Sequence, residues 1–397
     1  MKKYGLIGAH LPHSYSPQIH GRFGSYSYEL CEVSEEELPV LLKDEDFGGF
    51  NVTIPYKKTV MKYCDELSTQ AKEIGSVNTV VRMADGRLKG YNTDYYGFVY
   101  LLQTAGIDVA GRKCLVLGSG GASVTVQAAL RSLEASEVVV ISRSGENNYE
   151  NISRHLECEV MINTTPVGMY PNNGQSPIDL DAFPNCKGVV DLIYNPNCTK
   201  LVLDAMERSI PATGGLAMLV AQAKEASELF QGIKIEDEAC EEAVESLRKQ
   251  MLNMVLIGMP GCGKTFVGKV LAKKHGRKLV DIDKMIVKRE GMIIPEIFAQ
   301  KGEDYFRQVE TEILAEVCKE SGLVISTGGG VIKRDCNYPL VKQNGVIYWV
   351  QRDLDKLATA GRPLSLSVPL EQLYAERKDA YASWSDGVID NNKERRI

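Results

Sequence analysis

Short apolar segments rich in β-branched residues alternate with longer segments of helical periodicity along most of the chain. The clearest of them run from Lys113 to Leu117, from Glu137 to Ile141, from Val160 to Asn163, from Met254 to Ile257 and from Val346 to Val350. Their alternation with helices predicts α/β layers with largely parallel sheets. Asp85 and Gly86 separate two further short runs and predict a local β-hairpin instead.

The chain length of 397 residues is too great for one ordinary core, so at least two domains are expected. Residues 236–250 have the pattern of a charged amphipathic helix, and an apolar strand follows almost at once. The main boundary is therefore predicted near Met251, between one domain over 1–250 and another over 251–397.

The charge and the cysteines narrow the class of protein. A formal net charge of −6 gives no overall positive field, so neither nucleic acid nor an anionic membrane is an expected partner. The ten cysteines include no CxxC pair or zinc spacing, and the apolar run at the N-terminus is too short for a signal peptide. No apolar run approaches the ~20 residues that span a bilayer. These features predict a cytoplasmic protein with reduced thiols.

A glycine-rich loop lies between the apolar strand that ends at Leu117 and a helical segment predicted from Val124 to Leu133. The loop consists of Gly118, Ser119, Gly120, Gly121, Ala122 and Ser123. Strand, glycine loop and helix in this order favour a dinucleotide site, because the backbone and the helix N-terminus can hold a pyrophosphate. A plain turn is the alternative.

The choice of cofactor depends on the residues about 20 positions further on, where NAD enzymes place an acid. Here the next strand is followed by Ser142, Arg143 and Ser144. An arginine flanked by hydroxyls can hold a 2′-phosphate, which favours NADP over NAD. An ordinary surface arginine after a strand is the alternative.

A polar cluster ends at Lys57, in the segment from Asn51 through Pro55. Lys57 is a candidate general acid and base, since reduction of a ketone needs a proton for the developing alkoxide. Asp94 is the candidate partner carboxylate. Spacing alone leaves open a solvated lysine and an aspartate in a turn.

Taken together, a series of segments resembles the shikimate dehydrogenase family, in order from residue 4 to about 250. They are Tyr4 to Gly8, His13 to Pro17, Asn51 to Lys57, Val77 to Thr79, Gly90 to Asp94, the Gly118 loop, Asn163 to Met169 and Gly214 to Ala223. The resemblance implies a substrate domain over about 1–100 and 219–250 and a Rossmann NADP domain over about 101–218. The family's usual Asn-Arg-Thr is replaced here by Ser142-Arg143-Ser144, which keeps the arginine.

The same resemblance implies roles for individual residues. Lys57 and Asp94 would carry the proton chemistry, and Leu192 and Gly215 would line the nicotinamide side. The hydroxyls and carboxylate of the substrate would be bound by Ser14, Ser16, Thr53, Asn78, Tyr194 and Gln222.

A second glycine-rich loop, from Gly258 to Thr265, matches the P-loop pattern G-x-x-x-x-G-K-[ST] directly after an apolar strand. In such a loop the backbone around Gly261, Cys262 and Gly263 cradles phosphates, Lys264 contacts the transferred group and Thr265 reaches Mg²⁺. The motif predicts ATP or GTP binding without naming the acceptor. Leu279 to Asp283 is expected to end the next strand with both acids on one side, helix capping being the alternative.

The motifs after the P-loop resemble shikimate kinase over residues 252 to about 391. They are Gly302 to Glu310, Ser326 to Gly330, Gly361 to Leu364 and Leu373 to Arg377. The resemblance implies a P-loop α/β kinase in which Asp281 helps to hold Mg²⁺ and Arg362 meets the phosphates from a lid. Asp283, Arg307, Arg377, Gly328, Gly329 and Gly330 would bind the acceptor. The stretch from Arg362 to Arg377 is short for the lid region of that family.

Both resemblances together predict a bifunctional enzyme that reduces 3-dehydroshikimate with NADPH and then phosphorylates the resulting shikimate with ATP. Two rival hypotheses stay open: a dehydrogenase that also uses quinate, fused to a small-molecule kinase, and a catalytically silent pathway regulator with the same folds. Intact Lys57, Asp94, Lys264, Asp283 and Arg307 argue against the regulator.

Overall fold

The computed structural model describes residues 2–11, 14–358 and 369–392. Its contacts divide the chain into two compact units, one of Met1–Tyr194 with Leu201–Leu247 and the other of Asn195–Lys200 with Arg248–Ile397. The division falls within helix α8 (Asp237–Met251), whose last residue is the position where the sequence predicts the domain boundary. Each unit is described by itself.

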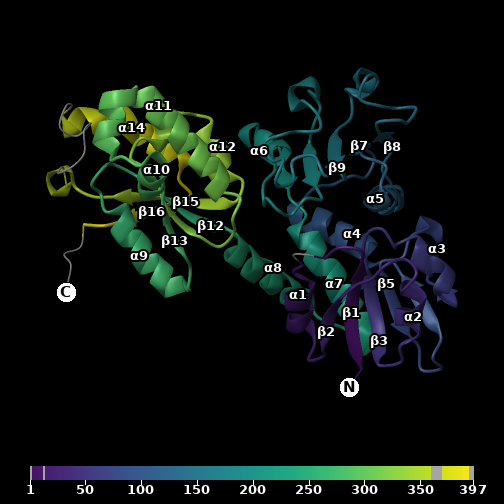
Figure 1. Cartoon of the computed structure of the whole chain (residues 1–397). Helices are drawn as coiled ribbons and strands as arrows, with labels where there is room; N and C mark the ends of the chain where they lie inside the picture. The colour runs from purple at the N-terminus through teal and green to yellow at the C-terminus, as the bar shows by residue number, and fades with distance from the viewer. Residues whose placement is uncertain (1, 12–13, 359–368, 393–397) are drawn as a thin grey trace. The chain divides into compact units, whose positions relative to one another are not determined.

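The first sheet of the first unit is mixed, with strand order β2-β1-β3-β5-β6-β4 (Figure 1). Its strands are β1 (Lys3–Gly8), β2 (Tyr28–Glu32), β3 (Phe47–Val52), β4 (Glu66–Leu67), β5 (Thr79–Arg82) and β6 (Leu88–Tyr91). β1 pairs in parallel with β2 and β3, whereas β5 is antiparallel to β3 and β6. The hairpin predicted at Asp85 and Gly86 is thus confirmed, and Gly86 supplies the positive φ of 87° at its turn.

Helices α4 (Thr93–Ala105) and α7 (Leu216–Gln231) pack along each other in this unit, and both begin at the edge of the site described below. α4 begins where the side chain of Asn92 accepts a hydrogen bond from Tyr95 N, and it ends at Gly106 in the left-handed conformation. The other helical segments of this part are α1 (Ser16–Phe23), α2 (Leu38–Lys43), α3 (Thr69–Ile74) and the 3₁₀ turn η1 (Thr59–Tyr63).

The second sheet of this unit is parallel throughout, with the order β11-β10-β9-β7-β8. Its elements are β7 (Lys113–Leu117), α5 (Gly121–Ser132), β8 (Glu137–Ile141), η2 (Ile152–His155), β9 (Val160–Asn163), η3 (Leu180–Ala182), β10 (Gly188–Asp191), α6 (Lys200–Glu207) and β11 (Ala212–Thr213). The three strands predicted in this region have the expected bounds. The chain reverses its direction of winding between β7 and β9, and at such a point the carboxyl ends of the strands leave a crevice for a ligand.

The second unit is built on another parallel sheet, with the order β13-β14-β12-β15-β16. Its strands are β12 (Asn253–Ile257), β13 (Leu279–Asp281), β14 (Val324–Ser326), β15 (Gly345–Gln351) and β16 (Gly387–Asp390). Its helical segments are α9 (Lys264–His275), α10 (Ile282–Glu290), α11 (Ile294–Val317), η4 (Val331–Lys333), α12 (Asn337–Lys342), η5 (Leu354–Lys356) and α14 (Leu370–Trp384). Val255, Leu256 and Ile257 of the central strand are fully buried, as expected for a strand with both faces covered.

Two local predictions are wrong in detail. α5 begins at Gly121, three residues earlier than predicted, because glycine and small residues there already adopt the first helical turn. The extended segment expected to reach Asp283 ends at Asp281, which caps α10 by accepting a hydrogen bond from Lys284 N. Asp283 therefore lies in the first turn of a helix rather than on a strand.

Within the described part of the chain, no helix is both long enough and apolar enough to cross a membrane.

Candidate active sites

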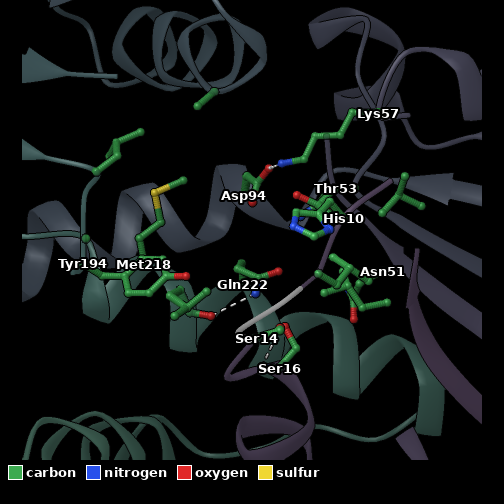
Figure 2. A pocket seen from close by; sticks show the side chains of 18 residues that line it. His10, Ser14, Ser16, Asn51, Thr53, Lys57, Asp94, Tyr194, Met218 and Gln222 are labelled. Atoms are coloured by element: carbon green, nitrogen blue, oxygen red, sulfur yellow. Dashed lines mark hydrogen bonds and ion pairs between the residues drawn. The ribbon is translucent and has the colours of Figure 1, made fainter. Parts of the chain in front are cut away.

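A cavity of about 390 Å³ lies in the first unit where its two sheets approach each other. Every substrate-binding residue predicted for this unit lines it, together with both residues predicted to carry the proton. Figure 2 shows many of these side chains directed into the cavity from several separate segments. The predicted residues that line it are Ser14, Ser16, Thr53, Lys57, Asn78, Asp94, Ala122, Leu192, Tyr194, Gly215 and Gln222.

The two residues predicted to carry the proton form an ion pair in this cavity. Lys57 Nζ donates a 2.6 Å hydrogen bond to Asp94 Oδ2, with the side chains only 20% and 13% exposed. Lys57 follows β3, and its carbonyl accepts a hydrogen bond from Val77 N, which fixes the backbone beneath the lysine. Asp94 lies in the first turn of α4, where the helix N-terminus favours a negative charge. The pair thus holds the Lys57 amine at the cavity wall.

A buried hydrogen-bond network orients the amide of Asn78. Its Oδ1 accepts a 2.7 Å hydrogen bond from Thr93 N, and its Nδ2 donates a 3.0 Å bond to Thr93 Oγ1. Because a backbone N–H can only donate, this contact identifies the oxygen of the amide. Thr93 Oγ1 in turn lies 3.4 Å from Gln222 Oε1, so the network joins Asn78 and Gln222, two of the residues predicted to bind the substrate.

The other residues predicted to bind the substrate are held in place by contacts with nearby residues. Ser14 Oγ accepts a hydrogen bond from Ser16 N, at the start of α1. Thr53 N donates to Ile7 O, which ties the end of β3 to β1. The Tyr194 ring meets Tyr15 edge to face, and burial raises the pKa of its phenol, so Tyr194 enters the site as a neutral hydroxyl.

The cavity also contains residues that the site prediction did not name, among them His10, Asn51 and Met218. Asn51 lies two positions before Thr53, so a strand alternation would have placed both side chains on one face. Met218 follows Gly215 within the first turn of α7. No comparable pattern marks His10.

The glycine loop after β7 has the backbone that a dinucleotide site requires. Gly118 has a φ of 104°, and a side chain there would lie 2.8 Å from Thr164 Oγ1. Gly120 is the N-cap of α5, whose first turn contains Gly121 and Ala122. The free N–H groups of this helix end point to an anion site. Ser119 lies between Gly118 and Gly120.

Leu192 and Gly215, predicted for the nicotinamide side, are in contact. A side chain at Gly215 would collide with the backbone carbonyl of Leu192, and Gly215 N donates to Ile193 O at 2.9 Å. The close approach of these two backbones therefore requires glycine at position 215.

Ser142, Arg143 and Ser144 follow β8 directly, and the Arg143 side chain is exposed. Ser142 N donates to Asn147 O, so the loop folds back on itself after the strand. These three residues do not line the cavity. Their position beside the end of β8 is where a nucleotide ribose lies in doubly wound folds, and their role stays a prediction.

The P-loop of the second unit surrounds its own lysine. Gly258, Gly261 and Gly263 have positive φ angles of 141°, 83° and 94°. Lys264 Nζ donates to the carbonyls of Gly258 and Met259 at 2.9 and 3.1 Å, while α9 begins at Lys264 itself. The loop is therefore a ring of N–H groups at a helix N-terminus, which suits phosphate oxygens.

Asn391, after β16, closes the other side of this loop. Its Nδ2 donates a 2.7 Å hydrogen bond to the carbonyl of Cys262. The side chain of Cys262 is almost fully buried below the loop.

The predicted Mg²⁺ residues are hydrogen-bonded to each other, since Thr265 Oγ1 donates to Asp281 Oδ2 at 2.7 Å. A hydroxyl and a carboxylate are the hard oxygen donors that Mg²⁺ takes together with water and phosphate. Over residues 2–11, 14–358 and 369–392 there is no cluster of three or more histidine, cysteine or acidic side chains that would form a protein-only metal site. The donor set thus fits a metal held partly by its nucleotide.

The acceptor residues predicted for the kinase gather around the loop from Gly328 to Gly330. A side chain at Gly330 would collide with the Arg307 guanidinium, and one at Gly328 would lie 3.0 Å from Asp283 Oδ1. Arg377 Nη1 donates to Gly329 O at 2.9 Å. The glycines therefore leave room for two arginines and a carboxylate to converge.

The two arginines differ in how fully they are paired. Arg307 donates to Glu310 at 2.7 Å and to Glu303 at 3.2 Å, all within α11. Arg377 is 2% exposed, yet its Nε and Nη2 have no hydrogen-bond partner among the described residues. A buried guanidinium with free donors points to an anion that completes it.

Glu310 was not named by the site prediction, although an Arg-x-x-Glu spacing on a helix is a recognisable ion-pair signal. Its side chain is fully buried, and burial raises its pKa against the opposing effect of Arg307. Arg362 lies outside the described residues.

Two family models match the chain, one in each unit. The model of the shikimate dehydrogenase substrate binding domain matches residues 6–80, and the model of shikimate kinase matches residues 260–396. Among curated relatives, the NADP(+) shikimate dehydrogenase of Clostridium perfringens is 37% identical in an alignment of 269 positions that covers 62% of this chain and 99% of that protein. The corresponding enzyme of Caldicellulosiruptor bescii is 40% identical and covers 58% of this chain and 89% of its own length.

Solved structures agree with these matches. A chorismate mutase/shikimate 5-dehydrogenase fusion protein from Clostridium acetobutylicum is 38% identical, with a TM-score of 0.60 over 62% of this chain and 97% of that one. Shikimate 5-dehydrogenase from Thermus thermophilus, in complex with NADP(H) and shikimate, is 32% identical with a TM-score of 0.57, over 62% and 99%. Quinate dehydrogenase from Corynebacterium glutamicum, in complex with NAD, is 26% identical with a TM-score of 0.57, over 62% and 99%.

These matches confirm the predicted families and the α/β fold class of both units. The chain belongs to the shikimate dehydrogenase family through its first unit and carries a shikimate kinase domain after it.

Proposed function

We propose that the first unit reduces 3-dehydroshikimate to shikimate with NADPH and that the second phosphorylates the 3-hydroxyl of shikimate with ATP. The observation that supports the dehydrogenase reaction is the Lys57–Asp94 ion pair in the wall of a cavity whose other polar side chains, apart from His10, are hydroxyls and amides. Such a lining suits a small polyhydroxylated ring. The second half depends on two buried arginines beside the P-loop.

In the dehydrogenase step, NADPH supplies a hydride to the carbonyl carbon. Lys57 donates a proton to the carbonyl oxygen as negative charge develops on it, so that an alcohol forms. Asp94 keeps the amine charged and directed, because its carboxylate accepts a hydrogen bond from Nζ. In the opposite direction the neutral Lys57 removes the hydroxyl proton, and the cavity walls limit the access of water to the reacting atoms.

The hydrogen-bond network of Asn78, Thr93 and Gln222 would orient the substrate in the cavity. Thr93 fixes the amide of Asn78, and Gln222 reaches the same network from α7. Groups held in this way need not reorganise when the ring binds, which reduces the entropy cost of positioning it.

In the kinase step, ATP supplies the phosphoryl group to the ring hydroxyl. Lys264 and the N–H groups of the P-loop hold the phosphates, and Arg377 has free donors for the carboxylate of the acceptor. Asp283 lies next to Gly328, where it can accept a hydrogen bond from a ring hydroxyl. Thr265 and Asp281 would hold Mg²⁺, which neutralises charge on the phosphates when bound.

The test is a substrate-specific assay with the full chain. Shikimate with NADP⁺ should give NADPH absorbance, and shikimate with ATP and Mg²⁺ should give ADP. Quinate should replace shikimate poorly in both reactions. Comparable rates with quinate would support a quinate-using dehydrogenase, in line with the Corynebacterium neighbour. Absence of both activities in a folded protein that binds the substrates would favour a silent regulator.

A further inference from the structure

A cluster of aromatic and polar side chains lies behind the cavity of the first unit. It consists of His20 on α1, Tyr28 on β2 and Asn51 on β3. Of these three, only Asn51 lines the cavity, so His20 and Tyr28 form a layer behind it.

The hydroxyl of Tyr28 holds a cavity residue. It donates a 2.7 Å hydrogen bond to Asn51 Oδ1. Asn51 Nδ2 donates to Thr79 Oγ1 at 3.0 Å, so both ends of that amide are fixed by residues outside the cavity. Burial raises the pKa of Tyr28, which therefore keeps its proton and can act as a donor.

His20 holds the Tyr28 ring in place. The two rings stack with centroids 4.0 Å apart and an angle of 14° between their planes. His20 is 1% exposed, and its Nδ1 lies 2.7 Å from the hydroxyl of Tyr26, which donates to Ser227 on α7. Because that hydroxyl proton is already used, Nδ1 of His20 must be the donor in their contact. The imidazole is thus clamped in one orientation.

We infer that Tyr28 is a positioning residue for the dehydrogenase, which aligns Asn51 on the ring of the substrate, and that His20 holds Tyr28 for this purpose. The inference rests on the proposed function of the first unit. Among the described residues, Tyr28 forms no hydrogen bond with the Lys57–Asp94 pair or with the glycine loop, so its loss should weaken the binding of the ring and spare the cofactor.

The test is Tyr28→Phe, which keeps the stacked ring and removes only the hydroxyl. The KM for shikimate should rise about three- to tenfold, as expected for one lost hydrogen bond. The KM for NADP⁺ and kcat at saturation should stay within twofold of wild type. Tyr4→Phe is the matched control, since the Tyr4 hydroxyl donates a 2.8 Å bond to Phe230 O in the same part of the unit and does not line the cavity. Tyr4→Phe should lower the melting temperature about as much as Tyr28→Phe does, without changing the KM for shikimate.

A double-mutant cycle separates positioning from a general loss of stability. If Tyr28 acts through Asn51, the combination of Tyr28→Phe with Asn51→Ala should raise the KM by clearly less than the product of the two single effects. Unchanged KM in Tyr28→Phe, or equal increases in the KM values of both substrates, would overturn the inference. If the wild-type chain itself fails to oxidise shikimate, the proposed function has failed instead, so the two failures are distinguishable.

Discussion

Lys57 and Asp94 come from different elements of the first unit, yet their charged atoms lie 2.6 Å apart at the cavity wall. Because both side chains are mostly buried, the pair is held in a lower dielectric than a surface ion pair and its geometry is well defined. Lys58, the next residue, is exposed and has no place in the cavity. The chain therefore offers the proposed catalytic lysine and an internal control at adjacent positions.

Lys57→Ala should reduce the kcat of shikimate oxidation by about 10²- to 10⁴-fold, the usual contribution of a general acid or base. Kinase activity of the same protein should stay close to wild type, because Lys57 and the P-loop lie in separate compact units. Steady-state assays of both reactions decide the point, with Lys58→Ala as the control. Oxidation of shikimate at a near wild-type rate by Lys57→Ala would exclude the assigned role.

Arg143→Glu should change the preference of the dehydrogenase from NADP toward NAD. The substitution replaces an exposed cation after β8 with an acid that repels a 2′-phosphate and accepts hydrogen bonds from ribose hydroxyls. The measurement is kcat/KM for each cofactor. Arg154→Glu makes the same change of charge at another exposed arginine of this half and should leave the ratio unaltered. An unchanged ratio in Arg143→Glu would place the 2′-phosphate elsewhere.

His20 should make the stability of the first unit depend on pH. Burial lowers the pKa of its imidazole to about 3, so the unfolded chain takes up a proton near pH 6.5 while the folded chain does not. The contribution of the neutral His20 imidazole to the free energy of unfolding is therefore complete above about pH 6.5 and declines as the pH falls toward 3. The free energy of unfolding should drop by roughly 2 kcal/mol between pH 7 and pH 5 through this group alone.

The comparison of wild type with His20→Gln isolates that contribution. Urea unfolding of the first unit should be measured at pH 7, 6 and 5. The free energy of unfolding of wild type should fall relative to that of His20→Gln as the pH decreases. His275→Gln, at an exposed histidine of α9, should track the wild type at all three values. A constant difference between wild type and His20→Gln would show that the imidazole titrates alike in both states.

Much of the fold follows from local pattern in the sequence. The strands from Lys113 to Leu117 and from Glu137 to Ile141 are continuous apolar runs, because both of their faces are covered by other elements. Boundaries are less determined by pattern. Asp281 ends its strand because its side chain caps the helix that follows. The sequence pattern alone does not reveal this end, because a carboxylate at the same position would equally suit an extended segment that binds a metal.

The site could be predicted only in part, for a physical reason. Motifs identify residues such as Asn78 and Gln222, which line the cavity, but the supporting contacts come from segments distant in the sequence. Tyr28 hydrogen-bonds to Asn51 across two strands, and Ser227 reaches the same layer from α7. Neither residue carries a local signal, since a tyrosine on a strand and a serine on a helix are ordinary core or surface positions.

Arg377 is expected to bind the carboxylate of the kinase acceptor. Arg377→Lys keeps the positive charge but removes the planar donors Nε and Nη2, which have no partner among the described residues. The KM for shikimate should rise by about ten- to a hundredfold, since a charge-assisted hydrogen bond contributes roughly 1.5 to 3 kcal/mol. The KM for ATP should change little. Lys378→Ala, at the exposed neighbour, is the control and should leave both values unaltered.

Arg307 requires a different design, because its removal strands a buried carboxylate. Arg307→Ala should destabilise the second unit by about 3 to 5 kcal/mol, the usual cost of an unpaired buried charge, since Glu310 lies 2.7 Å from the guanidinium and is fully buried. Adding Glu310→Gln should restore most of that stability without restoring the affinity for shikimate. Thermal unfolding together with the two KM values separates these effects. If Arg377→Lys weakens ATP as much as shikimate, its free donors belong to the nucleotide site, and the carboxylate must be bound elsewhere.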